Sequence, residues 1–321
     1  MRVLITGVSG FIGSALAEEL SKSGEFQVYG FVRFISQGRR LPGGNIEYVV
    51  GDLIDYYSIE RIISGIRPEV VVHVGALTPV SESYSQPVTY GEVNYLGTVH
   101  LLEALRRHGG EQLRVVVIAG TTEMFDTSGD IDGYNEFRPE SPYAVSKVAA
   151  VLYGEYMYRA YGLPVVTVIP TNTYGRAFVN QRHFFIEKVI TELLTGKREL
   201  YLGNPDAVRD WMFRDDHVNA YVSVIKAVLN GRDGVVGGRF AFGTGSGFTT
   251  RETADLIRRL IGSDAVFHWG SGSRPVETGR IVISRSAIER ARGVLGWYPR
   301  FNLVDGLARA IDEWRRVLGV N

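Results

Sequence analysis

Short apolar runs alternate with segments of helical hydrophobic spacing along the first half of the chain. The first run, at 2–5, ends in Thr6 and Gly7, and a helical pattern follows from Phe11 to about Ser23. Further strands are predicted at 27–32, 47–50, 70–74, 114–119 and 164–169, with helical stretches at 57–65, 91–107 and 143–161. Strands joined by helix-length connections favour parallel pairing, because each crossover returns the chain to the edge from which it started. The pattern predicts an α/β fold with a doubly wound parallel sheet that helices cover on both faces.

The pattern changes after about residue 175, where glycine-rich loops separate the helices and strand candidates are short. Helices are predicted near 183–196, 215–230, 250–262 and 305–318. We therefore expect a first domain over 1–175 and a smaller C-terminal lobe formed mainly by 176–321. Because 239–243 still has the pattern of a sheet strand, the two are expected to interleave in sequence.

Composition excludes several classes of protein. Of the 321 residues, 45% are hydrophobic and 22% charged, which is typical of a globular protein and not of a disordered one. The 35 basic residues balance 35 acidic ones, so neither nucleic acid nor a membrane is expected as a partner. The absence of cysteine excludes disulfides, thiolate metal sites and cysteine nucleophiles, and no metal is predicted. With no secretion signal and no apolar stretch near 18 residues, the expected location is the cytoplasm.

A glycine-rich turn follows the first predicted strand. Residues 6–13 read TGVSGFIG, in which Gly7 permits a tight turn, Gly10 lets the backbone approach a pyrophosphate and Gly13 allows close helix packing. Phe11 and Ile12 open the helix and are assigned to the same site. The strand-turn-helix setting predicts a Rossmann-like domain over 1–175 that binds NAD or NADP, and a mainly substrate-binding lobe after it. The alternative is a turn that serves packing alone.

Arg33 indicates which dinucleotide is bound. It ends the second predicted strand, where NAD-binding proteins place an acid for the ribose 2′-hydroxyl, and Arg39 and Arg40 follow. A guanidinium pairs well with a 2′-phosphate, so NADP is favoured, and NAD remains possible if Arg33 is only a solvated surface residue.

Three further residues are assigned to the cofactor. Asp52, after the third strand, is expected to accept a hydrogen bond from the adenine amino group, or else to cap a helix. Leu53 beside it and Ala76 after the fourth strand complete the set.

Tyr143 and Lys147 lie four residues apart at the start of a predicted helix, and therefore on one face of it. After a dinucleotide-binding pattern this pair has a specific use. The lysine is expected to stabilise the tyrosinate and lower the tyrosine pKa, so that the phenolate removes a proton from a hydroxyl while hydride leaves the carbon. The alternative is ordinary packing between helical neighbours.

Several motifs together resemble the extended short-chain dehydrogenase/reductase family along the whole chain. They are TGVSGFIG, GDLID (51–55), Asn94 in NYLGT, GTTE (120–123), SPYAVSK and NTYG. GALTPV (75–80), LGNPDAVRDW (202–211) and the strand-end arginine are similar to the sugar-nucleotide branch, above all to GDP-mannose 4,6-dehydratases and related deoxyhexulose reductases. The resemblance implies an enzyme that binds NADP and a nucleotide-diphosphate sugar, with Thr121, Tyr143 and Lys147 as the hydride-transfer triad.

Glu123 bears on the type of reaction. By the resemblance, 4-epimerases lack an acid there, whereas 4,6-dehydratases use a glutamate to abstract the C5 proton and expel the C6 hydroxyl. The dTDP-glucose dehydratases place Asp before this Glu, but here the neighbour is Thr122. We therefore expect a nucleotide-sugar 4,6-dehydratase of GDP-mannose type, a lyase that gives an NDP-4-keto-6-deoxyhexose. The alternatives are a 4-epimerase like UDP-glucose 4-epimerase, a 4-keto reductase, or a non-catalytic dinucleotide sensor.

The resemblance also assigns residues to the sugar nucleotide. They are Thr78 for a hexose hydroxyl, Asn172 for a phosphate or sugar oxygen, Arg209 and Arg274 for the diphosphate, and Glu277 for the nucleotide ribose. For the arginines, the alternative is a surface charge paired with Asp210 or Glu277. The polar segment 126–139 is expected to lie over the sugar.

A homodimer is expected from the helix that follows Tyr143, because its apolar residues extend beyond one inward stripe. These residues are Val148, Leu152, Tyr153, Tyr156 and Met157. Together with the helix at 97–107, two copies would form a four-helix bundle. Alternatively, these side chains pack within one subunit.

Overall fold

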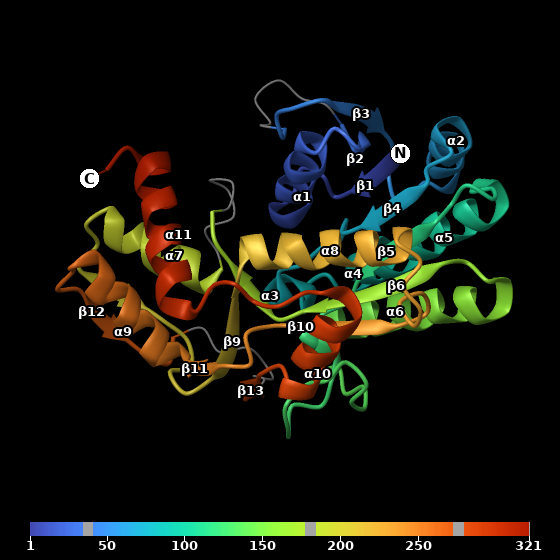
Figure 1. Cartoon of the computed structure of the whole chain (residues 1–321). Helices are drawn as coiled ribbons and strands as arrows, with labels where there is room; N and C mark the ends of the chain where they lie inside the picture. The colour runs from blue at the N-terminus through green and yellow to red at the C-terminus, as the bar shows by residue number, and fades with distance from the viewer. Residues whose placement is uncertain (35–40, 177–183, 272–278, 321) are drawn as a thin grey trace.

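The computed structural model describes residues 1–34, 41–176, 184–271 and 279–320. A seven-stranded parallel sheet lies at its centre, in the strand order β10-β6-β5-β4-β1-β2-β3 (Figure 1). Its strands are β1 (Arg2–Thr6), β2 (Gln27–Val32), β3 (Ile46–Val50), β4 (Val70–His73), β5 (Val115–Ala119), β6 (Val165–Pro170) and β10 (Arg239–Phe242). All six pairings are parallel, which confirms the predicted fold class.

Helices cover both faces of this sheet. On one face are α1 (Phe11–Lys22) and α8 (Arg214–Leu229); on the other are α2 (Tyr56–Ile66), α5 (Gly97–His108) and α6 (Pro142–Tyr161). Successive residues of β4 point to opposite layers: Val70 and Val72 join the apolar cluster of α1 and α8, and Val71 joins the other. A strand buried on both faces must be apolar throughout, as the sequence of β4 is.

The predicted helix over 91–107 is divided. Its first part, η1 (Gly91–Leu96), is a π-helical turn, and α5 begins at Gly97. The chain between β4 and η1 forms two short helices, α3 (Val80–Ser83) and α4 (Pro87–Tyr90), and the 3₁₀ turn η2 (Thr122–Met124) follows β5. The π turn places Asn94 in the buried layer between this segment and α6.

The second lobe, on the left in Figure 1, has its own core around Trp211, Phe213 and Trp314. One small sheet contains β7 (Asn172–Tyr174), β9 (Val208–Phe213), β11 (Gly247–Thr249) and β13 (Arg280–Ile281), and another pairs β8 (Glu199–Tyr201) with β12 (Val266–His268). The helices of the lobe are α7 (Phe185–Leu194), α9 (Thr250–Ile261) and α11 (Leu303–Leu318). α10 (Arg285–Arg290) and the π turn η4 (Ala291–Leu295) lead back toward the large sheet.

The two lobes interleave in sequence. β10 pairs with β6 at the edge of the large sheet, and α8 packs against α1, although both elements follow residue 175. A boundary at 175 would therefore separate part of the first lobe from the sheet it completes. In the part of the chain that the structure describes, no helix has the length and apolar character needed to span a membrane.

Candidate active site

A cavity of about 880 Å³ lies at the carboxyl ends of the large sheet and is lined by both lobes. All sequence-predicted site residues within the described ranges line it. They are Gly7, Gly10, Phe11, Ile12, Gly13, Arg33, Asp52, Leu53, Ala76, Thr78, Thr121, Glu123, Tyr143, Lys147, Asn172 and Arg209. Arg39, Arg40, Arg274 and Glu277 lie outside the described residues. Parallel strands bring their carboxyl ends to one edge, which explains why residues far apart in sequence meet here.

The glycine-rich turn fits a dinucleotide. Gly7 has a φ of 68°, and its carbonyl accepts a hydrogen bond of 2.8 Å from the Gly10 amide. A Cβ on Gly13 would overlap the Gly7 carbonyl, so only glycine lets α1 begin this close to β1. Among the residues that the structure describes, no side chain caps the N-terminus of α1, and the amides and positive dipole end of this helix suit a pyrophosphate.

Asp52 does not cap α2. The cap is Asp55, whose carboxylate accepts from the amides of Tyr57 and Ser58. Asp52 instead stabilises its own turn, with Oδ1 accepting from the Ile54 amide at 3.3 Å, and it lines the cavity. The helix-cap alternative for Asp52 was therefore wrong.

A buried polar chain that the sequence did not indicate runs under the cavity through His73. The hydroxyl of Thr98 donates to the Asn94 carbonyl at 2.6 Å, so Nε2–H of His73 donates to Thr98 at 3.0 Å. Nδ1 of His73 then accepts from the Thr6 hydroxyl at 2.7 Å, and this hydroxyl accepts from the Gly75 amide at 3.0 Å. Burial, with a smaller effect from the positive charge of Lys147, lowers the pKa of His73 to about 3 and keeps it neutral.

Tyr143 and Lys147 occupy the first two turns of α6, which begins cleanly because Ser141 caps it and Pro142 takes its first position. Both side chains are buried. Burial raises the pKa of Tyr143, the hydrogen bond with Thr121 lowers it, and the charge of Glu123 raises it further. The pKa of Tyr143 is therefore raised, opposite to the lowering expected from Lys147, because desolvation by burial is the largest effect on this phenol. Burial likewise lowers the pKa of Lys147, to about 8.

Asn172 and Arg209 line the part of the cavity formed by the second lobe. Oδ1 of Asn172 is buried without a hydrogen-bond partner among the described residues, which leaves an acceptor for a ligand. Arg209 is buried rather than a surface charge, and its guanidinium donates to the Val208 carbonyl at 2.8 Å. The Asp210 carboxylate, proposed as its alternative partner, accepts instead from the Thr244 amide at 2.9 Å and the Gly245 amide at 2.9 Å.

The segment 126–139 does not line the cavity, contrary to the expectation that it covers the sugar. Phe125 stacks on Phe137, and Ile131 forms a β-bridge with Ile283 of the second lobe. Apolar contacts thus hold this segment against the outside of the site.

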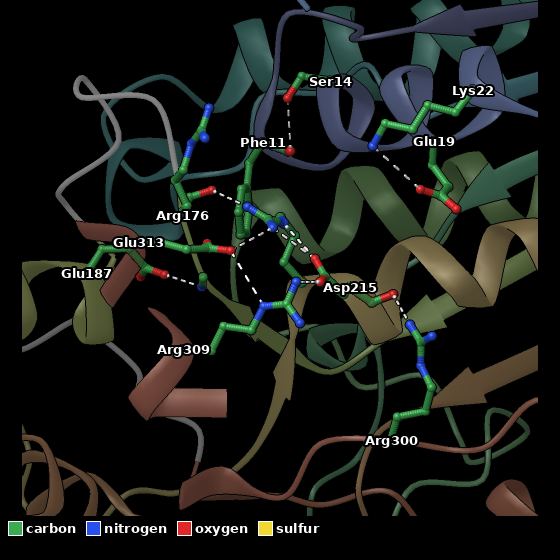
Figure 2. A network of polar contacts seen from close by, with 12 residues as sticks. Phe11, Ser14, Glu19, Lys22, Arg176, Glu187, Asp215, Arg300, Arg309 and Glu313 are labelled. Carbon is green, nitrogen blue, oxygen red and sulfur yellow. Dashed lines mark hydrogen bonds and ion pairs between the residues drawn. The ribbon is translucent and has the colours of Figure 1, made fainter. Parts of the chain in front are cut away.

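Sequence reasoning missed several residues that line the cavity from α7, β8, β9 and α8. They include Glu187, Lys188, Tyr201, Trp211, His217 and Tyr221. Lys188, one of five lysines, was the most conspicuous of them in the sequence. Glu187 is buried, which raises its pKa to about 7, and its Oε1 accepts from the Gly175 amide at 2.8 Å (Figure 2).

Comparisons with known proteins agree with this architecture. A family model described as GDP-mannose 4,6 dehydratase matches residues 4–310. A UDP-glucose 4-epimerase of Mycolicibacterium smegmatis is 32% identical over 335 residues, which cover 98% of this chain and 99% of that protein. A dTDP-glucose 4,6-dehydratase of Streptomyces niveus is 30% identical, with 98% and 93% covered. The solved structure of a Thermus thermophilus UDP-glucose 4-epimerase in complex with NAD has a TM-score of 0.84 at 28% identity, covering 98% of this chain and 99% of that one.

The family match extends over most of both lobes, including the glycine turn, the Tyr143 and Lys147 pair and Arg209. The relatives are sugar-nucleotide dehydratases and epimerases, two activities of one enzyme family. The protein is thus a member of the GDP-mannose 4,6-dehydratase family, in the nucleotide-sugar epimerase and dehydratase branch of the extended short-chain dehydrogenases/reductases.

Proposed function

We propose that this protein is a nucleotide-sugar 4,6-dehydratase of GDP-mannose type, which converts an NDP-hexose into its 4-keto-6-deoxy form. The observation that carries the proposal is the position of Glu123. It lines the cavity close enough to Tyr143 for its charge to raise the tyrosine pKa. A carboxylate beside the base that acts at C4 is suitably placed to act at the neighbouring C5.

The roles of the side chains follow from this arrangement. The glycine turn and Lys147 would hold a nicotinamide dinucleotide in the cavity, and this cofactor would supply the hydride acceptor for C4 and the hydride donor for C6. Tyr143 removes the proton of the C4 hydroxyl, with Thr121 as its hydrogen-bond partner and Lys147 one turn away on the same helix. Glu123 removes the C5 proton and transfers it to the C6 hydroxyl, which leaves as water. C5 then takes up one proton. This proton balances the one that Tyr143 removed from the C4 oxygen, so the product differs from the substrate by the loss of one water molecule.

A 4-epimerase is the second candidate, because the M. smegmatis relative and the T. thermophilus neighbour both carry that name. An epimerase uses the same tyrosine, since it also oxidises C4, but it needs no base at C5. Glu123 is therefore the residue that separates the two functions.

We infer NADP as the cofactor from Arg33, which lines the cavity at the end of β2. Its guanidinium is suited to a 2′-phosphate. The neighbour crystallised with NAD supports the coarser statement of a nicotinamide dinucleotide.

We also infer a homodimer through α5 and α6. Leu152 and Tyr156 are 44% and 43% exposed, although both belong to the apolar stretch that follows Tyr143. Met157 is fully buried and Tyr153 donates to Glu103 of α5 at 2.8 Å, so only part of the stretch serves the subunit core. The exposed part is free to pack against a second copy.

Mass spectrometry of the protein with a panel of NDP-hexoses, starting with GDP-mannose, tests the reaction. A product lighter by the mass of one water supports dehydration, whereas an isomer of unchanged mass supports epimerisation.

In Glu123→Gln we expect hydride transfer to the cofactor to persist, while exchange of the C5 hydrogen with deuterated solvent and loss of water collapse. Glu136→Gln is the matched control, because this exposed carboxylate lies in the segment outside the cavity. Full activity of Glu123→Gln would contradict the proposal.

A further inference from the structure

His217, in the first turn of α8, is a cavity residue with no role in the proposed reaction. Its side chain is buried, lines the cavity and stacks on Tyr221 with a centroid distance of 5.3 Å. Nδ1 lies 2.8 Å from the hydroxyl oxygen of Thr173. Nε2 is buried and has no hydrogen-bond partner among the residues that the structure describes. A buried ring nitrogen without a partner needs an explanation.

The neighbours of His217 fix which nitrogen carries the proton. The Thr173 hydroxyl also lies 3.1 Å from the Thr171 carbonyl, which accepts only, so its single proton points there. Nδ1–H of His217 must then donate to Thr173, and Nε2 holds a lone pair. Burial lowers the pKa of His217 to about 3, so the ring stays neutral. The cavity wall therefore presents one oriented hydrogen-bond acceptor.

The layers of the fold indicate which ligand meets this acceptor. Tyr143, which must touch the sugar, belongs to α6 on one face of the sheet, whereas His217 belongs to α8 on the other, next to α1 and the glycine turn. The sugar therefore occupies the Tyr143 side, and the dinucleotide lies between it and α8. Hydride transfer requires the nicotinamide end of the dinucleotide to lie beside the sugar, and the carboxamide NH₂ of that ring is a hydrogen-bond donor.

We propose that Nε2 of His217 accepts a hydrogen bond from the carboxamide NH₂ of the nicotinamide and so acts as a positioning residue for the ring. The inference rests on the dinucleotide of the proposed function, and not on the choice between dehydration and epimerisation. A fixed amide turns one face of the ring toward the substrate, which hydride transfer requires.

The start of α8 is held firmly enough for this role. Figure 2 shows Arg309 of α11 between two carboxylates, with 3.0 Å from its Nη2 to Asp215 Oδ2 and 3.7 Å from its Nε to Glu313 Oε1. On the other side, the Asp216 carboxylate accepts from the Arg300 amide at 2.9 Å. These contacts lie directly before His217 in the chain, so its ring enters the cavity in one orientation.

Three ligands test the proposal by calorimetry, without any turnover. They are the dinucleotide, its acetylpyridine analogue, in which a methyl group replaces the amide NH₂, and the matching ADP-ribose, which lacks the ring. The wild type is expected to bind the dinucleotide about tenfold more tightly than the acetylpyridine analogue, because that analogue leaves Nε2 without a donor. His217→Phe keeps an aromatic ring on Tyr221 and removes Nε2, so the preference should disappear while ADP-ribose affinity stays unchanged.

Three other outcomes of the binding experiments would overturn the proposal. Equal affinity of the wild type for the dinucleotide and the acetylpyridine analogue would show that the carboxamide NH₂ has no acceptor in the cavity wall. This measurement needs no variant. Equal loss of affinity for all three ligands in His217→Phe shows a merely structural role. If the nucleotide sugar, titrated in parallel, is the only ligand that His217→Phe binds more weakly, His217 belongs to the substrate site. Failure of the protein to dehydrate any sugar leaves these binding results intact and contradicts only the proposed function.

Discussion

The side-chain amide of Asn94 donates to the Ser146 hydroxyl at 3.0 Å, which joins the π-helical turn to the helix that carries Tyr143 and Lys147. The same amide group donates to the Leu77 carbonyl at 3.0 Å, and its oxygen accepts from the Leu77 amide at 2.8 Å. One buried side chain thereby fixes α6 relative to the cavity wall that follows β4. A π turn often marks a functional site, and here it aims this side chain.

Replacement of Asn94 by Ala should lower the free energy of unfolding by about 2–4 kcal/mol, because the buried Ser146 hydroxyl and both partly buried backbone groups of Leu77 lose a partner. Urea denaturation measures this loss. Asn230→Ala is the control, since that side chain is exposed, and it should change stability by less than about 0.5 kcal/mol. A similar, small effect of both substitutions would show that Asn94 does not hold the two segments together.

Tyr143→Phe should reduce turnover by about 10² to 10⁴-fold while cofactor binding persists, because only the proton acceptor is removed. Single-turnover absorbance of the reduced nicotinamide measures the step. Burial raises the tyrosine pKa, so the phenol of the free protein should stay protonated through neutral pH. Binding of the positively charged oxidised nicotinamide should lower the pKa of Tyr143, so that the tyrosinate absorbance appears at a lower pH than in the free protein. Tyr143→Phe should lack this absorbance change. Near-normal turnover of the variant would exclude Tyr143 as the base.

Acid should destabilise the protein through His73 and His217, whose pKa values burial lowers to about 3. Below about pH 6.5 the two imidazoles are protonated in the unfolded chain but stay neutral in the folded protein. The free energy of unfolding therefore falls as pH falls. Each ring contributes up to about 1.4 kcal/mol per pH unit. Urea denaturation between pH 7 and pH 5 checks this, and His73→Gln should give a shallower slope. Constant stability over that range would show that the two rings are protonated when folded.

Arg33→Ala should weaken binding of NADP more than binding of NAD, because the guanidinium pairs with a 2′-phosphate and offers an NAD ribose nothing comparable. Fluorescence titration with both dinucleotides measures the ratio. Tighter binding of NAD than of NADP by the wild type would contradict the assignment of NADP and leave the fold unaffected.

Light scattering at micromolar concentration should show a dimer. Leu152→Glu should yield a monomer, because it places a charge in the middle of the exposed part of α6. Val304→Glu, at a site 49% exposed on α11, is the matched control and should leave the dimer intact. A wild-type monomer, or a dimer that both variants retain, would argue against this interface.

The sequence predicted the large sheet well and the second lobe poorly, for a physical reason. The strand at 70–74 was found as Val70–His73, because a strand buried on both faces is apolar throughout. β9 was missed because Arg209 and Asp210 interrupt its apolar pattern. The partners that satisfy Asp210, the amides of Thr244 and Ile283, are distant in sequence.

The same distinction holds within the site. Cavity residues that belong to a local motif, such as Gly7, Gly13, Tyr143 and Lys147, are recognisable in the amino-acid sequence alone. His217 is not recognisable in this way, because the orientation of its ring depends on the contact with Thr173, and its place in the cavity depends on the packing of α8. Hydrophobic spacing also did not separate the π turn from α5, since both continue the same apolar face.

The late position of β10 in the chain has a consequence for biosynthesis. A nascent chain that ends at residue 175 has made β6 but not its partner β10, and it lacks α8, which covers α1. Such an intermediate exposes a long unpaired strand edge and an apolar helix face, both of which promote aggregation. Productive folding must therefore wait until the ribosome has delivered residues beyond Phe242, and the two lobes are expected to mature as one cooperative unit rather than one after the other.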